Sequence, residues 1–182
     1  LKSVESSTRV HGLLALRTML ETHPEPFNGL TDVVLRSTLD ACRDDIAEVL
    51  SSATETLQLM ASSLNCTSCA KSLLSILRSL DGKDDHVMKS MCVRKMCLLT
   101  MGMFVPNMSS ATVYNALDDL MPPIVASISN PSSAIRKEGV FLFVKIYSSV
   151  GDAHVRPYME KLSVSQQKLV TIYIRRSTKT SN

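Results

Sequence analysis

The feature that most constrains this chain is a helical pattern of apolar residues that recurs roughly every 40 residues. Four long segments carry it, and each is followed by a second helical pattern before the next begins. Two helices in a period of about 40 residues are typical of HEAT-type repeats, in which one hairpin buries its apolar face against the next. The four segments read STRVHGLLALRTML, AEVLSSATETLQLM, DHVMKSMCVRKMCLL and SAIRKEGVFLFVKI.

These segments predict an all-α fold, an α-solenoid of about four helical hairpins plus a closing C-terminal helix. An Arg or Lys early in the first helix of a hairpin is expected to brace the turn of the adjacent repeat, and Ser51 departs from this pattern. The final segment, residues 163–177, alternates like a strand over LVTIYI, but we predict a helix because an isolated strand is unstable. The positions in the four hairpins where the bracing Arg or Lys is expected are Arg9, Ser51, Lys89 and Arg136.

Breaks between the apolar patterns predict the helix boundaries. We expect a bend near Pro122 and Pro123. The next helix should start at Asn130, with Pro131 in the first helical position, where a missing N–H costs nothing. Gly82 is the expected C-cap of the fourth helix. The expected helices run to about 21 and over about 30–42, 45–64, 67–80, 85–104 and 109–129. The residues predicted to be buried are Ile135, Gly139, Leu142, Phe143 and Ile146 in the last hairpin, and Val10, Leu13, Leu14, Arg17 and Leu20 in the first helix.

The composition agrees with helices and carries no catalytic signature. Trp is absent and Met reaches 10 residues, whereas strands draw on β-branched and aromatic side chains. A net charge of +3 does not indicate the clustered basic face that nucleic acid binding requires. No phosphate-binding glycine loop, nucleophile elbow or kinase signature occurs. We predict a single domain over residues 1–182, with a disordered tail at 177–182, that is not an enzyme, needs no cofactor and binds no nucleic acid.

Five cysteines, an odd number, follow no disulfide framework. With no export signal and no apolar stretch of about 20 residues, they indicate a reducing intracellular compartment and no membrane insertion. The start without Met, in mid-pattern, indicates a piece of a longer protein. Cys66 and Cys69 in CTSC are spaced for a redox pair or half of a zinc site, with Cys42 and His86 as further ligands. Because no βαβ setting or ligand spacing supports either use, we interpret the cysteines as buried and inert.

Histidines and aspartate pairs are the remaining candidates for chemistry. His11, His23, His86 and His154 show no ligand spacing, and we interpret them as solvated or locally hydrogen-bonded. Two aspartate pairs precede helices, where the helix dipole favours carboxylates, and the third is interpreted as a solvated face. The pairs are Asp44–Asp45, Asp84–Asp85 and Asp118–Asp119.

The stretch from SSAIRKEGVFLFV through VGDAHVRPYMEKLS to QKLVTIYIRR resembles the C-terminal end of the CLASP family of microtubule-associated proteins. There an Arg-Lys pair leads into an apolar helix, a Gly-Asp break, a proline-containing helix and a closing basic segment. LDDLMPPIV, residues 117–125, resembles the helix just upstream, whereas Glu138, Gly139 and the TMGMFVPNMSSATV region depart from the family. The matching residues are Arg136, Lys137, Val140, Phe141, Val144, Gly151, Asp152, Pro157, Leu162, Lys168, Leu169, Tyr173, Ile174 and Arg176.

The resemblance implies a TOG-like domain of HEAT repeats, the C-terminal module of a longer protein. In this family the more N-terminal TOG domains engage tubulin, whereas the C-terminal one docks partners such as CLIP-type plus-end proteins, kinetochore motors or cortical adaptors. We therefore predict a non-catalytic protein–protein interaction module in the cytoplasm, at microtubule plus ends, the spindle and kinetochores, while other domains regulate microtubule dynamics. The alternatives are a tubulin-binding TOG domain that promotes microtubule rescue or stabilisation, and a homodimerising adaptor.

The turns inside the hairpins bear on the choice between these alternatives. Tubulin-binding TOG domains grip an acidic tubulin surface there with a Trp and with Lys or Arg. Here the turns read HPEPFNG, NCTS, VPNMSS and GDAH, with Phe27 in place of a Trp and no Lys or Arg. Since charge complementarity steers such association, we predict weak or indirect tubulin binding.

Cations toward the C-terminal end are the predicted partner-binding residues, as a patch for an acidic partner. The alternative is that they serve helix C-termini and solubility. They are Arg136, Lys137, Arg156, Lys161, Lys168, Arg175 and Arg176.

Overall fold

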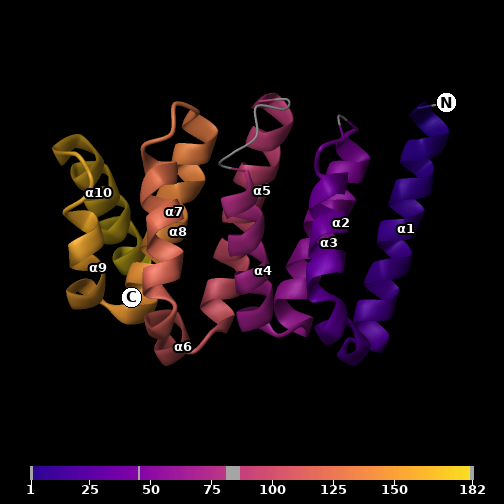
Figure 1. Ribbon diagram of the computed structural model, residues 1–182, viewed down its shortest axis with the longest axis horizontal. Coiled ribbons are helices and arrows are strands. Elements are labelled where there is room, and N and C mark those ends of the chain that lie inside the picture. The colour runs from indigo at the N-terminus through magenta and orange to yellow at the C-terminus, as the bar shows by residue number, and fades with distance from the viewer. Residues whose placement is uncertain (1, 45, 81–86, 181–182) are drawn as a thin grey trace. The chain divides into compact units, whose positions relative to one another are not determined.

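The computed structural model describes residues 2–44, 46–80 and 87–180, and every regular element in those ranges is a helix (Figure 1). The chain divides into two compact units, residues 1–107 and 108–182. Unit 1 holds α1 (Lys2–Thr22), the 3-10 helix η1 (Glu25–Leu30), α2 (Thr31–Ala41), α3 (Ala47–Ser63), α4 (Cys66–Ser79), α5 (Val87–Phe104) and η2 (Val105–Asn107). Unit 2 holds α6 (Ser110–Asn115), α7 (Leu117–Ile128), α8 (Ser133–Val150), α9 (Asp152–Met159) and α10 (Val164–Thr180).

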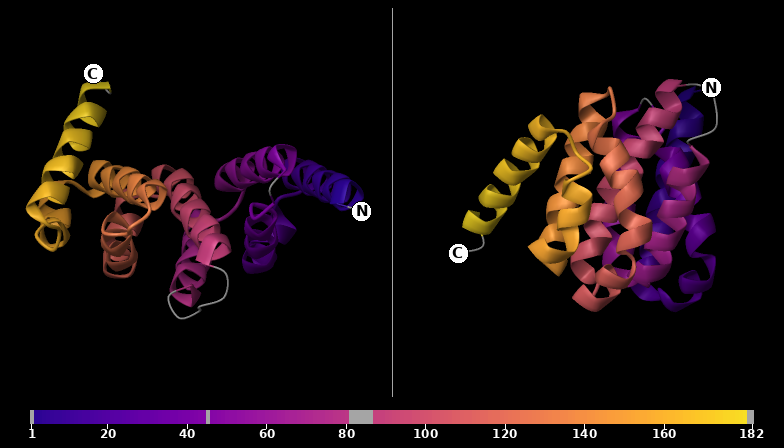
Figure 2. Two further views of the ribbon diagram at one scale, coloured as in Figure 1. Left: turned by 90° about the horizontal axis from the view of Figure 1, so that it is seen from above. Right: turned by 60° about the vertical axis from the view of Figure 1, so that its left-hand side comes forward.

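Unit 1 is built from two layers of helices. Helix α1 packs against α3, α2 packs against α4, and α5 contacts both α3 and α4. Seen from above, α1 and α3 lie in one layer beside α2 (Figure 2). The apolar faces of these helices supply the core, in which Leu35, Leu57 and Leu73 are fully buried. This is the packing that repeated one-sided apolar helices predict.

Asparagine side chains connect the turns within unit 1. Asn65 Oδ1 accepts a hydrogen bond from the backbone N–H of Ser68 at 3.0 Å and so caps α4. The backbone N–H of Asn65 donates to Asn28 Oδ1 at 3.0 Å, which links the turns of the first two hairpins. Asn107 Nδ2 donates to the carbonyl of Ala61 at 2.8 Å. These bonds hold successive turns together along one edge of the unit, the lower edge in Figure 1.

Unit 2 is organised around α8, which packs against α6, α7, α9 and α10. Gln166, near the start of α10, donates through Nε2 to Ser129 Oγ at 3.1 Å, just ahead of α8. Helices α8 and α10 therefore begin side by side and run in the same direction, like the first helices of successive repeats. All five positions predicted to be buried on the last hairpin are buried in α8.

The single helix expected over about 109–129 is interrupted at Ala116, between α6 and α7, and α7 continues through Pro122 and Pro123. The hydrogen bonds that these prolines cannot donate would have reached the carbonyls of Asp118 and Asp119. Those two residues lie in the exposed first turn of α7, so α7 tolerates the prolines without ending there.

The start of α8 also differs from the prediction. The helix begins at Ser133, so Pro131 precedes it instead of occupying its first position. The predicted N-cap, Asn130, is therefore wrong: the N-cap is Ser132, and no side chain caps the helix there. Asn130 Oδ1 instead accepts from the backbone N–H of Ser132 at 2.9 Å and forms a turn just before the helix.

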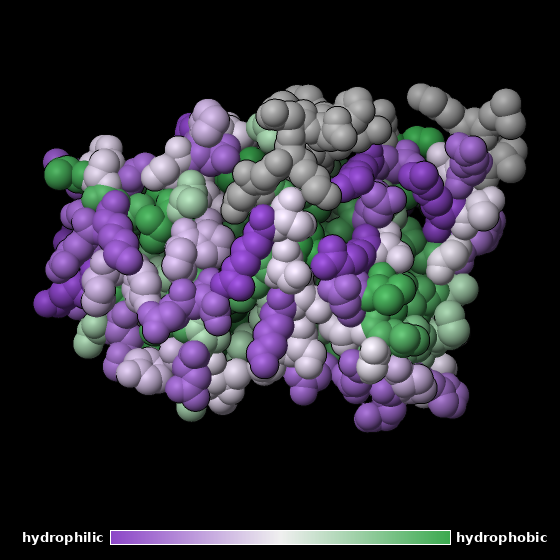
Figure 3. Space-filling view, viewed as in Figure 1, coloured by the Kyte–Doolittle hydropathy of each residue, from purple (hydrophilic) through white to green (hydrophobic). Residues whose placement is uncertain are grey.

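Three further expectations concern the buried face of the first helix, the C-terminal tail and Gly82. Leu14 was predicted to be buried but is 45% exposed, whereas Leu13 and Leu20 are buried; the apolar area over α1 and α3 is visible in Figure 3. Helix α1 packs on α3 along one side, so the full apolar face is not covered. Residues 177–180, predicted as tail, are helical, and Ser177 Oγ donates to the carbonyl of Ile174 at 2.9 Å. Gly82 lies outside the described residues.

Candidate protein-interaction surface

The seven predicted cations all lie in unit 2, and three of them contact a turn or a neighbouring side chain away from the aromatic pair described below. Arg136 Nη1 donates to the carbonyls of Asn130 at 2.9 Å and Pro131 at 2.7 Å, so it braces the turn before α8. Arg156 forms an ion pair with Asp152 one turn earlier on α9. Lys161 Nζ lies 5.2 Å from the centre of the Tyr158 ring. Arg136 therefore braces the turn before its own helix and not, as expected, the turn of the adjacent repeat.

The structure brings Lys137 and Arg176 together through two aromatic rings. Phe141 on α8 and Tyr173 on α10 meet edge to face, with ring centres 5.4 Å apart and an angle of 77° between the planes. Lys137 Nζ lies 5.5 Å from the centre of the Phe141 ring, and Arg176 Cζ lies 5.7 Å from that of Tyr173. We call these four residues the aromatic–basic cluster. Both rings are half-buried and both cations are exposed, so the cluster presents charge beside apolar surface.

Lys168 and Arg175 lie apart from the cluster. The helical spacing places Lys168, Ile172 and Arg175 on one strip of α10, and all three side chains are exposed. We call these residues the outer strip of α10. The predicted basic patch is therefore two surfaces, one shared by α8 and α10 and one on α10 alone.

Sequence reasoning missed the two aromatic rings as site residues. The signal was present, because Phe141 follows Lys137 by four residues and Tyr173 precedes Arg176 by three, spacings at which helical side chains touch. A cation one turn from an aromatic residue on each helix predicts two cation–π pairs. The pairing of the rings with each other depends on the contact between α8 and α10, which local spacing does not predict.

The other candidates for chemistry have structural contacts. Asp44 forms an ion pair with Arg9, with Oδ2 3.0 Å from Nη1. Its Oδ1 accepts a hydrogen bond from the backbone N–H of Ile46, as expected for a carboxylate before a helix. Asp118, predicted to be solvated, accepts a hydrogen bond from Tyr158 Oη at 2.6 Å, which raises the pKa of Tyr158 to about 12. The ring of His154 packs edge-on against a tyrosine.

The CTSC motif opens α4 without gathering ligands. Cys69 is fully buried and Cys66 is half-buried. Among the described residues, no group of three His, Cys, Asp or Glu side chains is placed to hold a metal ion. His86 lies outside the described residues. Within the same ranges, none of the helices combines the length and apolarity that a membrane span requires.

We predict that only two of the five thiols react quickly with a disulfide reagent at pH 8 in the folded protein. Burial raises the pKa of Cys42, Cys69 and Cys97 to about 12, so their thiolate fraction at pH 8 is roughly one in ten thousand. Cys66 and Cys92 are half-buried and remain accessible. A thiol titration should count about two fast-reacting thiols in the folded protein and five in denaturant. Five fast-reacting thiols before unfolding would contradict the burial of Cys42, Cys69 and Cys97.

The turns inside the hairpins provide no cationic grip. Residues 23–30, 64–65 and 105–109 of unit 1 and its boundary contain no Lys or Arg. Phe27 lies half-buried in η1, where its backbone N–H donates to the carbonyl of Pro24 at 3.0 Å. Arg156 lies in the second turn of α9, and its charge is paired with Asp152.

Comparison with known proteins finds relatives that match nearly the whole chain. No family model matches the chain. CLIP-associating protein 1-A of Xenopus laevis is 26% identical over 178 residues, which cover 98% of this chain and 12% of that protein. The CLIP-associated protein of Arabidopsis thaliana is 26% identical over 170 residues, or 93% of this chain and 11% of that protein. The chain is related to the CLASP family.

The CLASP relationship extends over nearly the whole chain, although the chain spans only about an eighth of the length of these relatives. Among solved structures, the crystal structure of the MAST/Orbit N-terminal domain matches with a TM-score of 0.62 and 19% identity over 91% of this chain and 70% of that one. The all-α fold of HEAT-type hairpins is therefore confirmed: α1–α2 and α3–α4 follow in order in unit 1, and in unit 2 α8–α9 is followed by the closing helix α10. Placement at the C-terminal end of a CLASP protein stays a prediction.

Proposed function

We propose that this chain is a non-catalytic protein-interaction module of a CLASP-type protein, and that the aromatic–basic cluster binds an acidic segment of a partner. The observation that carries the proposal is the pair of rings, Phe141 and Tyr173, held between Lys137 and Arg176 by two adjacent helices. Aromatic and Arg side chains contribute most of the binding energy in many interfaces. Flanking cations steer an acidic partner and set its register.

The rigidity of α8 and α10 supports the same proposal. The cluster lies on helices that pack against each other, so its side chains need little ordering when a partner docks. The two cations already contact rings of this chain, and these contacts fix where their charges lie. A preformed arrangement of this kind suits recognition better than it suits a reaction.

CLIP-type plus-end proteins are the partner class that we propose first, since the relatives are named CLIP-associating proteins. Kinetochore motors and cortical adaptors are further proposed partners. We propose the microtubule cytoskeleton, including plus ends, spindle and kinetochores, as the place of action, with other domains of the longer protein regulating the polymer.

Tubulin binding is the second candidate function, and kinship with microtubule-associated CLASP proteins favours it. The turns of unit 1 that would form the grip lack Lys and Arg, whereas association with an acidic surface gains speed and register from such charges. We propose that this chain alone binds tubulin weakly or only through a partner.

A pair of double charge reversals tests the proposal. Lys137→Glu with Arg176→Glu alters the cluster, and Lys168→Glu with Arg175→Glu makes the same charge change on the outer strip. In biolayer interferometry with a purified CLIP-type plus-end protein, we expect at least a tenfold rise in Kd for the first variant and less than a threefold change for the second. Circular dichroism checks that both variants remain helical.

Each other outcome changes the assignment. Equal losses in both variants would indicate general charge attraction, and a loss in the second alone would move the site to the outer strip. A tight 1:1 complex with purified tubulin in size-exclusion chromatography would support the second candidate. A dimer in light scattering that the outer-strip variant abolishes would support the homodimerising adaptor.

A further inference from the structure

The residues that line a groove in unit 1 are far in the sequence from those of the proposed α8–α10 surface. It has a volume of about 450 Å³ and runs between α2, α4 and α5. Leu39, Ile76 and Val93 are nearly buried and form its apolar floor. Pockets of about 300–1,000 Å³ are typical of ligand sites. The polar side chains that line it are Arg36, Ser37, Asp40, Arg43 and Ser79.

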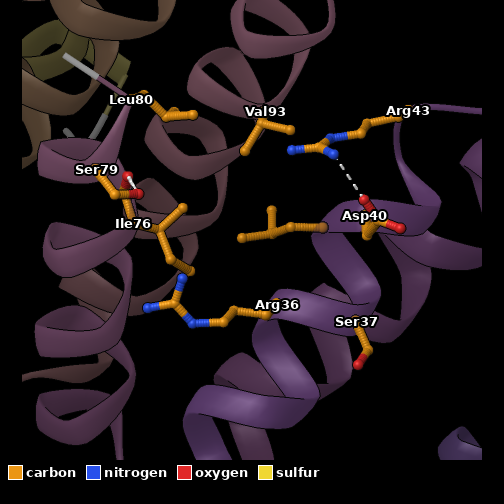
Figure 4. Close-up of a pocket in the computed structure, with 9 residues that line it drawn as sticks. Arg36, Ser37, Asp40, Arg43, Ile76, Ser79, Leu80 and Val93 are labelled. Carbon is orange, nitrogen blue, oxygen red and sulfur yellow. Dashed lines mark hydrogen bonds and ion pairs between the residues drawn. The ribbon is translucent and has the colours of Figure 1, made fainter. Parts of the chain in front are cut away.

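Two guanidinium groups stand at opposite ends of this floor. Arg36 lies on α2 and Arg43 lies in the turn that follows this helix, and Figure 4 shows their side chains reaching across toward Ile76 and Val93. Leu39 lies between the two arginines in the sequence. The groove therefore alternates charge, apolar surface and charge along one line.

The ion pairs that these arginines already form use only some of the N–H donors of each guanidinium group. Arg36 Nε pairs with Asp32 Oδ2 at 2.7 Å, and Arg43 Nη1 pairs with Asp40 Oδ1 at 2.9 Å. Each guanidinium has five N–H donors, and each pair uses one nitrogen. The four side chains are between 41% and 62% exposed, and exposed pairs one turn apart on a helix are worth only about 0.3–0.5 kcal/mol. A ligand carboxylate can therefore share or replace them at little cost.

We infer that the groove binds a peptide segment of a partner in which two carboxylates flank aliphatic side chains. A segment such as Glu-Leu-Leu-Glu carries one carboxylate for each guanidinium group. The intervening aliphatic side chains then lie against Leu39, Ile76 and Val93. Arg is the cation best suited to such carboxylates, because its planar group can donate two parallel N–H bonds to one carboxylate.

The groove discriminates against other anions. A phosphate or nucleic acid gains nothing from the apolar floor. An uncharged apolar segment would leave the guanidinium groups without new partners. The combination of floor and charges favours an acidic peptide with an aliphatic centre.

An NMR titration tests the inference independently of the α8–α10 cluster. The probe is the peptide GSELLEGS, added to the ¹⁵N-labelled chain, with GSESSEGS and GSKLLKGS as matched controls. We expect amide shifts concentrated in α2, α4 and α5, and at least a tenfold higher Kd for either control peptide. Shifts elsewhere, equal shifts with all three peptides, or no shift at millimolar peptide would overturn the inference.

Two variants assign the charges. Arg36→Gln with Arg43→Gln keeps the helix-forming length of both side chains and should raise the Kd for GSELLEGS at least tenfold. Lys71→Glu, an exposed cation of α4 that does not line the groove, should change it less than twofold. Ser79→Trp should block the groove sterically while the charges remain. If tripolyphosphate reproduces the shifts and the peptide does not, the groove is an anion site and the inference is wrong.

Binding of the CLIP-type protein is measured separately. The arginine variant leaves Lys137, Phe141, Tyr173 and Arg176 intact, so if it loses binding of GSELLEGS but keeps binding of the CLIP-type protein, the groove is a second site. If the Lys137→Glu, Arg176→Glu variant still binds GSELLEGS, the groove binds the peptide without the cluster. Failure of one proposal is therefore distinguishable from failure of the other.

Discussion

Phe143→Ala is expected to lower the free energy of unfolding of unit 2 by about 3–5 kcal/mol. Phe143 lies on α8, is fully buried and is among the largest side chains in the core. Truncation removes the transfer free energy of the ring and leaves a cavity where α8 meets its neighbours. Urea unfolding followed by circular dichroism measures the change as a lower midpoint with a similar slope.

Phe141→Ala is the matched control, because it makes the same truncation two residues away on the same helix. Phe141 is half-buried and contributes to the aromatic–basic cluster, so we expect a loss of stability of only about 1 kcal/mol. The same variant should weaken binding of the CLIP-type protein at least tenfold. Equal destabilisation by both truncations would contradict the assignment of one ring to the core and the other to the surface.

Gly139→Leu is expected to destabilise unit 2 by about 2–3 kcal/mol through overpacking. A Cβ added at Gly139 would lie 3.2 Å from the Ile128 Cγ1 and N atoms and from Ser127 Cβ. The glycine therefore allows α8 to approach the end of α7 closely. Further side-chain atoms have no space there, so the two helices must separate.

Gly12→Leu makes the identical change where no atom lies within 4 Å of an added Cβ. Because leucine is the better helix former, this variant should keep or raise stability by up to about 0.8 kcal/mol. Thermal unfolding of the two variants side by side checks the contrast. A similar decrease in both would mean that Gly139 matters through backbone freedom and not through the contact with α7.

Departure from the family pattern has a structural cause at Gly139. The sequence comparison with the family marked Glu138 and Gly139 as departures, and periodicity placed Gly139 on the buried face. The structure confirms the burial and adds the reason for glycine, the contact with Ile128. That contact joins two helices across a turn, which periodicity within one helix does not report.

Helix positions were predictable because their signals are local. The breaks at HPEPFNG and NCTS and the helical reading of the final segment agree with η1, the start of α4 and α10. The interruption at Ala116 was missed because no Gly or Pro stands there. Helix α7 continues through Pro122 and Pro123 because the bonds they cannot donate involve carbonyls near its first turn that remain close to water.

The basic patch was predictable in composition but not in arrangement. Charge counting placed Arg136 and Lys137 together, yet the structure gives Arg136 to the backbone of its own turn and Lys137 to the Phe141 ring. Neighbouring residues on a helix point in different directions, about 100° apart. Adjacent cations in a sequence therefore need not share a surface.

The sequence by itself determined that this chain forms helical hairpins with one-sided apolar faces, because helix periodicity and capping are properties of short segments. Tertiary structure alone decided that Phe141 meets Tyr173 and that Arg36 and Arg43 overlook the floor completed by Ile76 and Val93. Such contacts join residues far apart in the chain, and their geometry follows from how whole helices pack. The apolar pattern specifies that the helices must pack, and the shapes of the packed side chains specify which polar groups are brought together.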